Sequence, residues 1–153
     1  RNPVERAYSA WNMYHQFKDD PRHGWLYDER PFETAVEDEL AGKAIDPARR
    51  YLDRGLYMPQ LERYLAHVGP HRLIVHGFDE LRSDPARLVN AVLERLGLQS
   101  FPAGHPAFAM RSNARAYAAS MPDALRRRLR LFYSDDARDI REAFGIDLFA
   151  QSD

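Results

Sequence analysis

Leu73-Ile74-Val75-His76 is the stretch that decides the predicted fold, because it is apolar on consecutive positions and carries β-branched residues. This pattern is typical of a short strand covered on both faces, as in a parallel sheet. A lone strand would leave its backbone N–H and C=O groups unpaired in a core. Either the strand prediction fails or the partner strands lie in sequence outside these 153 residues, and we favour the second explanation.

The sequence on both sides of this stretch predicts helices, each bounded by capping or breaking residues. Asn2 suits an N-cap, Pro3 the first helical position, and Glu5 the carboxylate of a capping box. Gly69-Pro70 ends a helix, and Asp84-Pro85 begins another that ends at Gly97. The expected helices cover residues 3–17, 31–43, 58–68, 85–96, 122–133 and 134–145, and a long loop of the kind that is often functional covers 99–119.

The composition excludes several classes of protein. Lys plus Arg is 22 and Asp plus Glu is 23, and this balance argues against a nucleic-acid binder. The chain has no cysteine, which excludes disulfides and thiolate metal sites. Its longest apolar runs are too short to span a membrane, and we expect a cytoplasmic protein. His67, His71 and His76 do not have a metal-ligand spacing, so no metal is expected.

Arg1 and Ser9 are the residues that suggest a binding site. Arg1 precedes a helix whose free N-terminal amides and dipole would attract an anion, and its guanidinium can hold a phosphate through two hydrogen bonds. A hydroxyl from Ser9, two turns further on, would add a neutral donor. The same residues also fit a salt-bridged arginine and a serine on a polar helix face.

The stretch Arg1-Asn2-Pro3-Val4-Glu5-Arg6-Ala7-Tyr8-Ser9 resembles the 3′-phosphate-binding motif of sulfotransferases that use 3′-phosphoadenosine 5′-phosphosulfate (PAPS), in which a serine follows the arginine by eight positions. Arg54-Gly55-Leu56-Tyr57 is similar to the Arg-Gly-x-Tyr helix start of the heparan-sulfate-type branch and its bacterial relatives. Leu73-Ile74-Val75, Phe78-Asp79-Glu80-Leu81 and Asp84-Pro85 together resemble the late strand, turn and helix of this family.

A fourth similarity lies in the long loop. The family carries Lys-Gly-Arg or a variant there, closing over the 3′-phosphate and adenine, and this chain has Asn113-Ala114-Arg115. The resemblance makes Arg115 and Asn113 donor contacts, although the lysine and glycine are replaced. A solvated loop arginine is the alternative interpretation of Arg115.

The resemblance implies an α/β, P-loop-like fold with a three-layer parallel sheet and flanking helices, of which residues 1–153 would be the helix-rich C-terminal part of one domain. The lysine-bearing phosphate loop and the general base would lie upstream, so we expect no catalytic residue here except His15 as a candidate for proton transfer. The implied reaction moves a sulfuryl group from PAPS to a hydroxyl or amine of a carbohydrate, a polyketide or lipid, or another small molecule.

The resemblance also points to residues that would line the acceptor site. His15 and Gln16 lie where the family's acceptor site opens, and Arg54 and Tyr57 are further candidates for its wall. Without an acceptor, His15 and Gln16 would be polar residues facing solvent, and Arg54 and Tyr57 would serve a local turn. Two rival functions remain: a P-loop kinase-like nucleotide-dependent transferase, and a non-enzymatic helical interaction module. The acceptor, the oligomeric state and the pathway are not predicted.

Overall fold

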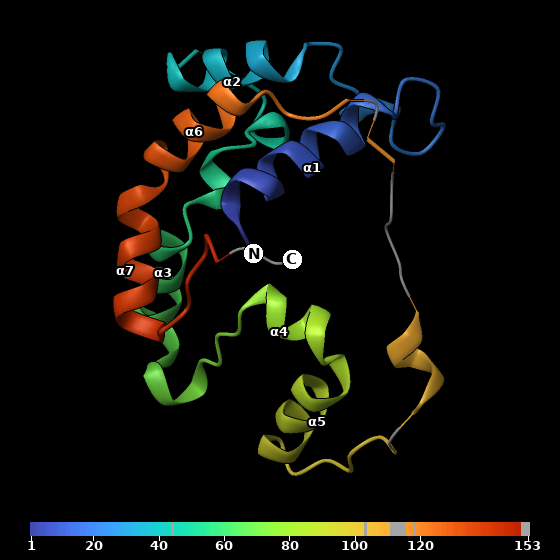
Figure 1. Ribbon diagram of the computed structural model, residues 1–153, viewed down its shortest axis with the longest axis vertical. Helices are drawn as coiled ribbons and strands as arrows, with labels where there is room; N and C mark the ends of the chain where they lie inside the picture. Colours follow the sequence, from blue (N-terminus) through green and yellow to red (C-terminus); the bar gives the residue numbers. More distant parts are fainter. Residues whose placement is uncertain (44, 103, 111–115, 118, 151–153) are drawn as a thin grey trace.

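The computed structural model describes residues 1–43, 45–102, 104–110, 116–117 and 119–150. Within these ranges the chain forms α-helices joined by short 3₁₀ turns and irregular segments (Figure 1). The α-helices are α1 (Pro3–His15), α2 (Phe32–Leu40), α3 (Met58–Val68), α4 (Phe78–Ser83), α5 (Pro85–Arg95), α6 (Asp123–Phe132) and α7 (Ser134–Phe144). The 3₁₀ turns are η1 (Gly24–Leu26), η2 (Pro47–Arg49), η3 (Asp53–Gly55), η4 (Pro70–Arg72) and η5 (Pro106–Ala109).

The predicted strand at residues 73–76 is wrong. Leu73 is extended, with φ −102° and ψ 129°, but no backbone ladder forms anywhere in the ranges given above. Exposure alternates along the segment, so it is not covered on both faces: Leu73 and Val75 are half-buried, whereas Ile74 and His76 are exposed. The expected α/β, P-loop-like fold with a three-layer parallel sheet is therefore corrected to an all-helical fold in the described ranges.

The predicted helices are observed, with differences at their ends. α3 has the expected bounds, whereas α1 ends two residues early and α2 is shorter at both ends than residues 31–43. Asn2 caps α1 as expected, its side chain accepting from the N–H groups of Val4 (3.0 Å) and Glu5 (3.4 Å). Glu5 does not complete a capping box in the structure but pairs with Arg126 on α6.

α1 is the central element of the main core. It packs against α2, η3 and α6, and its buried face includes Val4, Ala7 and Tyr8. Tyr51, Leu52 and Leu129 complete this core and are almost fully buried. A second, smaller cluster joins Ala137 and Ile140 of α7 to Leu148, with side chains of α3 packed against it.

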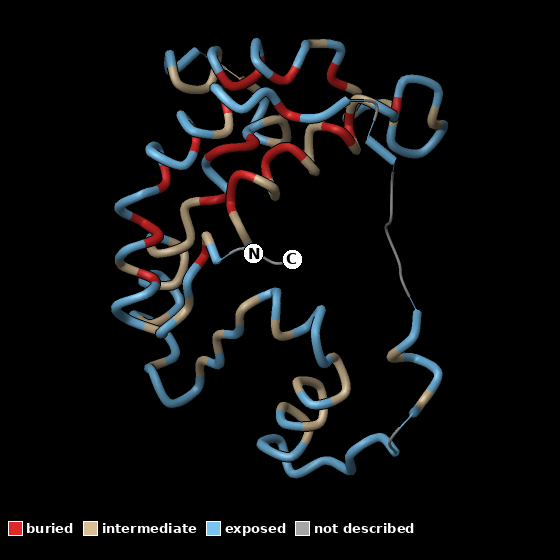
Figure 2. The backbone as a smooth tube through the Cα atoms, viewed as in Figure 1, coloured by how far each residue is buried: buried red, intermediate tan, exposed pale blue. Residues whose placement is uncertain are grey.

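The segment containing α4 and α5 forms an arm outside these two cores. The helices lie apart from the α1–α2–α6 body in Figure 1 and are drawn as exposed or intermediate along their length in Figure 2. None of the residues of α4 and α5 is buried, and α5 packs mainly against α4. Little burial therefore protects the arm.

Candidate functional site

The segments that carry three of the four motif similarities meet at the start of α1. The Tyr57 hydroxyl donates to the carbonyl oxygen of Arg1 at 3.0 Å. The Arg1 guanidinium lies over the ring of Phe78, 5.5 Å from its centroid. Residues separated by more than fifty positions thus surround the first turn of one helix.

The backbone amides at this helix end are already used. Pro3 has no N–H, the N–H groups of Val4 and Glu5 bind the Asn2 side chain, and that of Arg6 binds the Asn2 carbonyl at 3.0 Å. The expectation that free amides would attract an anion here is therefore wrong. A phosphate at this position would depend on side-chain donors instead.

The Arg1 guanidinium is the side-chain donor at this end. Arg1 is exposed, and its guanidinium makes one long hydrogen bond, to the Glu5 carbonyl at 3.5 Å. It forms no ion pair with any residue that the structure describes. Four of its five N–H groups are thus available to a ligand.

A cavity of about 210 Å³ adjoins Arg1 but does not have the charge of a phosphate pocket. Its lining brings one cation, Arg1, together with the carboxylates of Asp79, Glu80 and Asp147. Ser9 is not among the lining residues. A phosphate held by both Arg1 and Ser9 would therefore lie on the surface of α1 outside this cavity.

Ser9 is half-buried on α1, and its hydroxyl has no hydrogen-bond partner among the described residues. Eight residues at a helical rise of about 1.5 Å place it roughly 12 Å along the axis from Arg1. The structure thus leaves the Ser9 hydroxyl without a described partner and the Arg1 guanidinium with one long hydrogen bond, but it does not bring them together, because Arg1 lies over Phe78. Their joint contact with one phosphate stays a prediction.

The end of the long loop packs against the second half of α1. The side chains of Asn12 and Gln16 both donate to the Ala116 carbonyl, at 3.2 and 2.9 Å. The Tyr8 hydroxyl donates to the Ala119 carbonyl at 2.5 Å, and its ring stacks on Tyr117. Sequence reasoning missed Asn12, whose spacing of four from Gln16 places both amides on one helix face.

Asn113 and Arg115, the predicted donor contacts, lie outside the described residues.

The four predicted acceptor residues do not form one cluster, since His15 and Gln16 lie at the C-terminal end of α1 and Tyr57 lies at its start. At its C-terminal end, His15 Nδ1 donates to the Asp28 carbonyl at 2.8 Å, which leaves Nε2 as the acceptor nitrogen of a neutral ring. The His15 ring stacks on Trp11, with centroids 4.8 Å apart. Arg54 donates to the Pro47 carbonyl, and Tyr57 lies against Arg1 at the other end.

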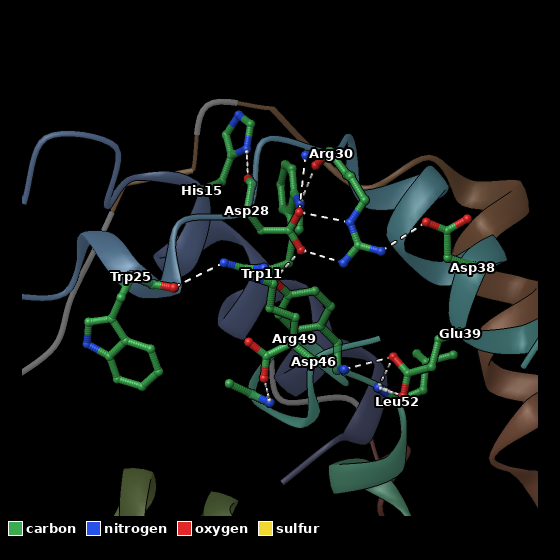
Figure 3. Close-up of polar contacts among 12 residues, drawn as sticks. Trp11, His15, Trp25, Asp28, Arg30, Asp38, Glu39, Asp46, Arg49 and Leu52 are labelled. Atoms are coloured by element: carbon green, nitrogen blue, oxygen red, sulfur yellow. Dashed lines mark hydrogen bonds and ion pairs between the residues drawn. The ribbon is translucent and has the colours of Figure 1, made fainter. Parts of the chain in front are cut away.

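A buried charged network behind His15 was not predicted (Figure 3). Asp28, which is 3% exposed, accepts two hydrogen bonds from the Arg30 guanidinium, at 2.9 and 2.7 Å, and one from Tyr51 at 2.9 Å. Burial by itself would raise the pKa of Asp28, but these hydrogen bonds outweigh it and keep the pKa below its ordinary value. Burial and then Asp28 raise the pKa of Tyr51, which therefore stays protonated and donates.

This network fixes the backbone at Asp28, whose carbonyl oxygen accepts the hydrogen bond from His15. Arg30 also donates to Asp38 at 2.9 Å, so one guanidinium links the loop before α2 to α2 itself. Trp11 donates to the Arg30 carbonyl at 2.9 Å. Side chains from α1, from α2 and from the segment before η3 thus hold the backbone that binds His15. The Asp-x-Arg spacing of Asp28 and Arg30 is the only local signal for it.

Comparison of the chain with family models, curated proteins and solved structures found no match. The described part of the chain holds no group of three or more His, Asp or Glu side chains arranged to bind a metal. Among the same residues, no helix is both long and apolar enough to cross a bilayer. The functional argument therefore rests on the motifs and on their arrangement around α1.

Proposed function

We propose that this chain supplies the 3′-phosphate-binding end of the donor site, and part of the acceptor wall, of a PAPS-dependent sulfotransferase. The observation that carries the proposal is the meeting of the motif-bearing segments on α1. Tyr57 and Phe78 contact Arg1, and the residue after Arg115, Ala116, is held by Asn12 and Gln16. A shared site requires such segments to lie on one helix, and they do.

The available donors fit the 3′-phosphate of the sulfate donor. Arg1 offers an exposed guanidinium without an ion pair, and Ser9 offers a hydroxyl without a partner in the described chain. Charge-assisted hydrogen bonds from arginine to phosphate are among the strongest in proteins. In the proposed mechanism these residues bind the end of PAPS remote from the sulfuryl group, and that binding energy aligns the reacting centre.

The chemistry itself would need groups that these residues do not provide. The acceptor oxygen or nitrogen forms a bond to sulfur as the bond to the 5′-phosphate oxygen breaks, and adenosine 3′,5′-bisphosphate leaves. The resemblance assigns the lysine that stabilises this leaving group to a phosphate loop upstream of Arg1, and it places the general base upstream of Arg1 as well. We therefore propose a binding role for Arg1, Ser9, Asn113 and Arg115 and no catalytic role for them.

The test is nucleotide binding by the protein that carries this chain. Adenosine 3′,5′-bisphosphate should raise its melting temperature far more than ATP or AMP. Arg1→Ala should weaken this binding in calorimetry by about tenfold or more, because one charge-assisted phosphate contact is lost. Arg127→Ala, which removes an exposed arginine on α6, is the control and should leave the affinity unchanged.

The rival functions predict other results. Equal protection by ATP would favour a kinase-like transferase, and protection by no nucleotide would favour the helical interaction module. Wild-type affinity of the Arg1→Ala protein for adenosine 3′,5′-bisphosphate would refute the assignment of Arg1. Ser9→Ala should give a smaller loss than Arg1→Ala, since a neutral hydrogen bond contributes less than a charged one.

A further inference from the structure

The Arg1 side chain lies in surroundings that disfavour a phosphate. Its guanidinium lies over the ring of Phe78, 5.5 Å from the centroid, beside the cavity of about 210 Å³. The other charged side chains that line this cavity are the carboxylates of Asp79, Glu80 and Asp147. A phosphate that approached Arg1 in this position would meet these carboxylates, and like charges at close range repel. Binding a phosphate therefore requires the guanidinium to leave this position.

The same movement is needed if Arg1 and Ser9 are to hold one phosphate, which is part of the proposed function and on which this inference rests. Ser9 lies on the same helix, roughly 12 Å further along the axis, and does not line the cavity. The backbone of Arg1 is fixed, because its carbonyl oxygen accepts from the Tyr57 hydroxyl at 3.0 Å. The movement is thus a rotation of the Arg1 side chain, and it breaks the contact with Phe78.

The contact between Arg1 and Phe78 joins the α4–α5 arm to the body of the molecule. Phe78 is the first residue of α4, and the N-terminus lies between α4 and the body in Figure 1. No residue of α4 or α5 is buried, so little burial holds the arm. The cavity lies at the same junction, since it is lined by residues 77–80, at the start of the arm, and by residues 145–148, which follow α7. Loss of a contact here should therefore change the stability of the arm.

We propose that Arg1 alternates between two partners: the ring of Phe78 when the sulfate donor is absent, and the 3′-phosphate beside Ser9 when the donor is bound. Donor binding then loosens the arm. A cation–π contact at an exposed site changes an equilibrium constant by about two- to fivefold. Because the coupling of two equilibria is reciprocal, the contact with Phe78 lowers the affinity for the donor by the same factor.

The first test is hydrogen exchange in the protein that carries this chain, with and without saturating adenosine 3′,5′-bisphosphate. Millisecond labelling and mass spectrometry should show exchange in α4 and α5 about two- to fivefold faster with the nucleotide, and no acceleration in the middle of α1. Unchanged or slower exchange in the arm while the nucleotide binds would overturn the switch and leave the proposed function standing. Failure of the nucleotide to bind would overturn both.

The second test removes the competing partner. Phe78→Leu should tighten binding of adenosine 3′,5′-bisphosphate about two- to fivefold in calorimetry and should abolish the effect of the nucleotide on exchange in the arm. Leu81→Ala is the control, because it removes an exposed apolar side chain of the same helix that does not line the cavity, and it should leave the affinity unchanged. Unchanged or weaker binding by Phe78→Leu would contradict competition between the ring and the phosphate.

The third test needs no nucleotide and still decides if Phe78→Leu does not fold. Arg1→Ala should speed exchange in α4 and α5 about two- to fivefold, since it removes the same contact from the other side. Arg127→Ala, at an exposed arginine of α6, should leave exchange in the arm unchanged. Equal exchange in the arms of Arg1→Ala and wild type would show that Arg1 does not restrain the arm, and the proposal would fail.

Discussion

Asp136 fixes the segment that follows Arg54-Gly55 to the C-terminal helices. Its buried carboxylate accepts from the backbone N–H groups of Tyr57 at 2.9 Å and Met58 at 2.8 Å. Because Tyr57 contributes no side-chain cap to α3, Asp136 caps this helix from a distant part of the chain.

Replacing Asp136 by alanine should therefore destabilise the protein. Two partly buried amides at the start of α3 would lose their acceptor, at a cost of about 1–3 kcal/mol in the free energy of unfolding. Urea unfolding followed by circular dichroism measures the change. Asp136→Asn keeps one acceptor oxygen and should lose less, and equal losses in the two variants would contradict a capping role.

At the scale of single residues, the sequence predicts local partners better than distant ones. Asn2 was predicted to cap α1 because the cap lies beside the helix it serves, and the structure confirms this. Asp136 and Asp28 gave no comparable signal, because their partners include residues up to 79 and 23 positions away. The predicted pairing of Arg1 with Ser9 rests on spacing alone and stays untested.

At the scale of elements, Gly55 explains how η3 approaches the junction of α6 and α7. A Cβ atom built on Gly55 would lie 2.7 Å from the Tyr133 hydroxyl and 2.9 Å from two of its ring carbons. Tyr133 is fully buried, and its hydroxyl donates to the Leu52 carbonyl at 3.0 Å. The glycine of Arg-Gly-x-Tyr is therefore required by packing in this chain.

Gly55→Ala should destabilise the protein by about 1–3 kcal/mol, since the buried ring has no free space to move into. Thermal unfolding of single and double variants measures this. In a Tyr133→Leu background the clash is absent, so adding Gly55→Ala should cost markedly less. If Gly55→Ala lowered the free energy of unfolding equally in both backgrounds, the Gly55–Tyr133 contact would not be its cause.

The same scale shows why the helix predictions were confirmed and the sheet prediction was wrong. A helix satisfies its hydrogen bonds within one stretch, so periodicity and caps located α1, α3 and α5. A strand needs a partner that its own sequence does not specify, and residues 73–76 find none in the described ranges. The apolar, β-branched pattern correctly indicated an extended backbone at Leu73, but it did not indicate whether a sheet forms.

At the scale of the whole molecule, stability is unevenly distributed. The α1–α2–α6 body contains the main core, and Leu129 at its centre has no exposed surface. The α4–α5 arm contributes no buried residue (Figure 2). Apolar side chains such as Leu81 and Leu96 are exposed there. The motif-bearing segments meet between these two parts, since Phe78 begins the arm and Arg1 begins the body.

Hydrogen exchange should therefore divide the chain into two classes of amide. Amides in α5 should exchange at least about 100-fold faster than those in the middle of α1 and α6, because little burial opposes opening of the arm. Mass spectrometry of peptides from each helix in native buffer measures the difference. The body amides should exchange only through global unfolding, whereas the arm amides should exchange through local opening.

Two variants separate these routes. Leu129→Ala should lower the free energy of unfolding by about 2–5 kcal/mol and speed exchange in α1 and α6, while α5 should change little because it already opens on its own. Leu96→Ala, at a residue that is 63% exposed, should leave exchange in the body unchanged. If Leu129→Ala accelerated exchange in α5 as much as in α1, the arm would unfold together with the body, and the contact between Phe78 and Arg1 would be part of one cooperative unit.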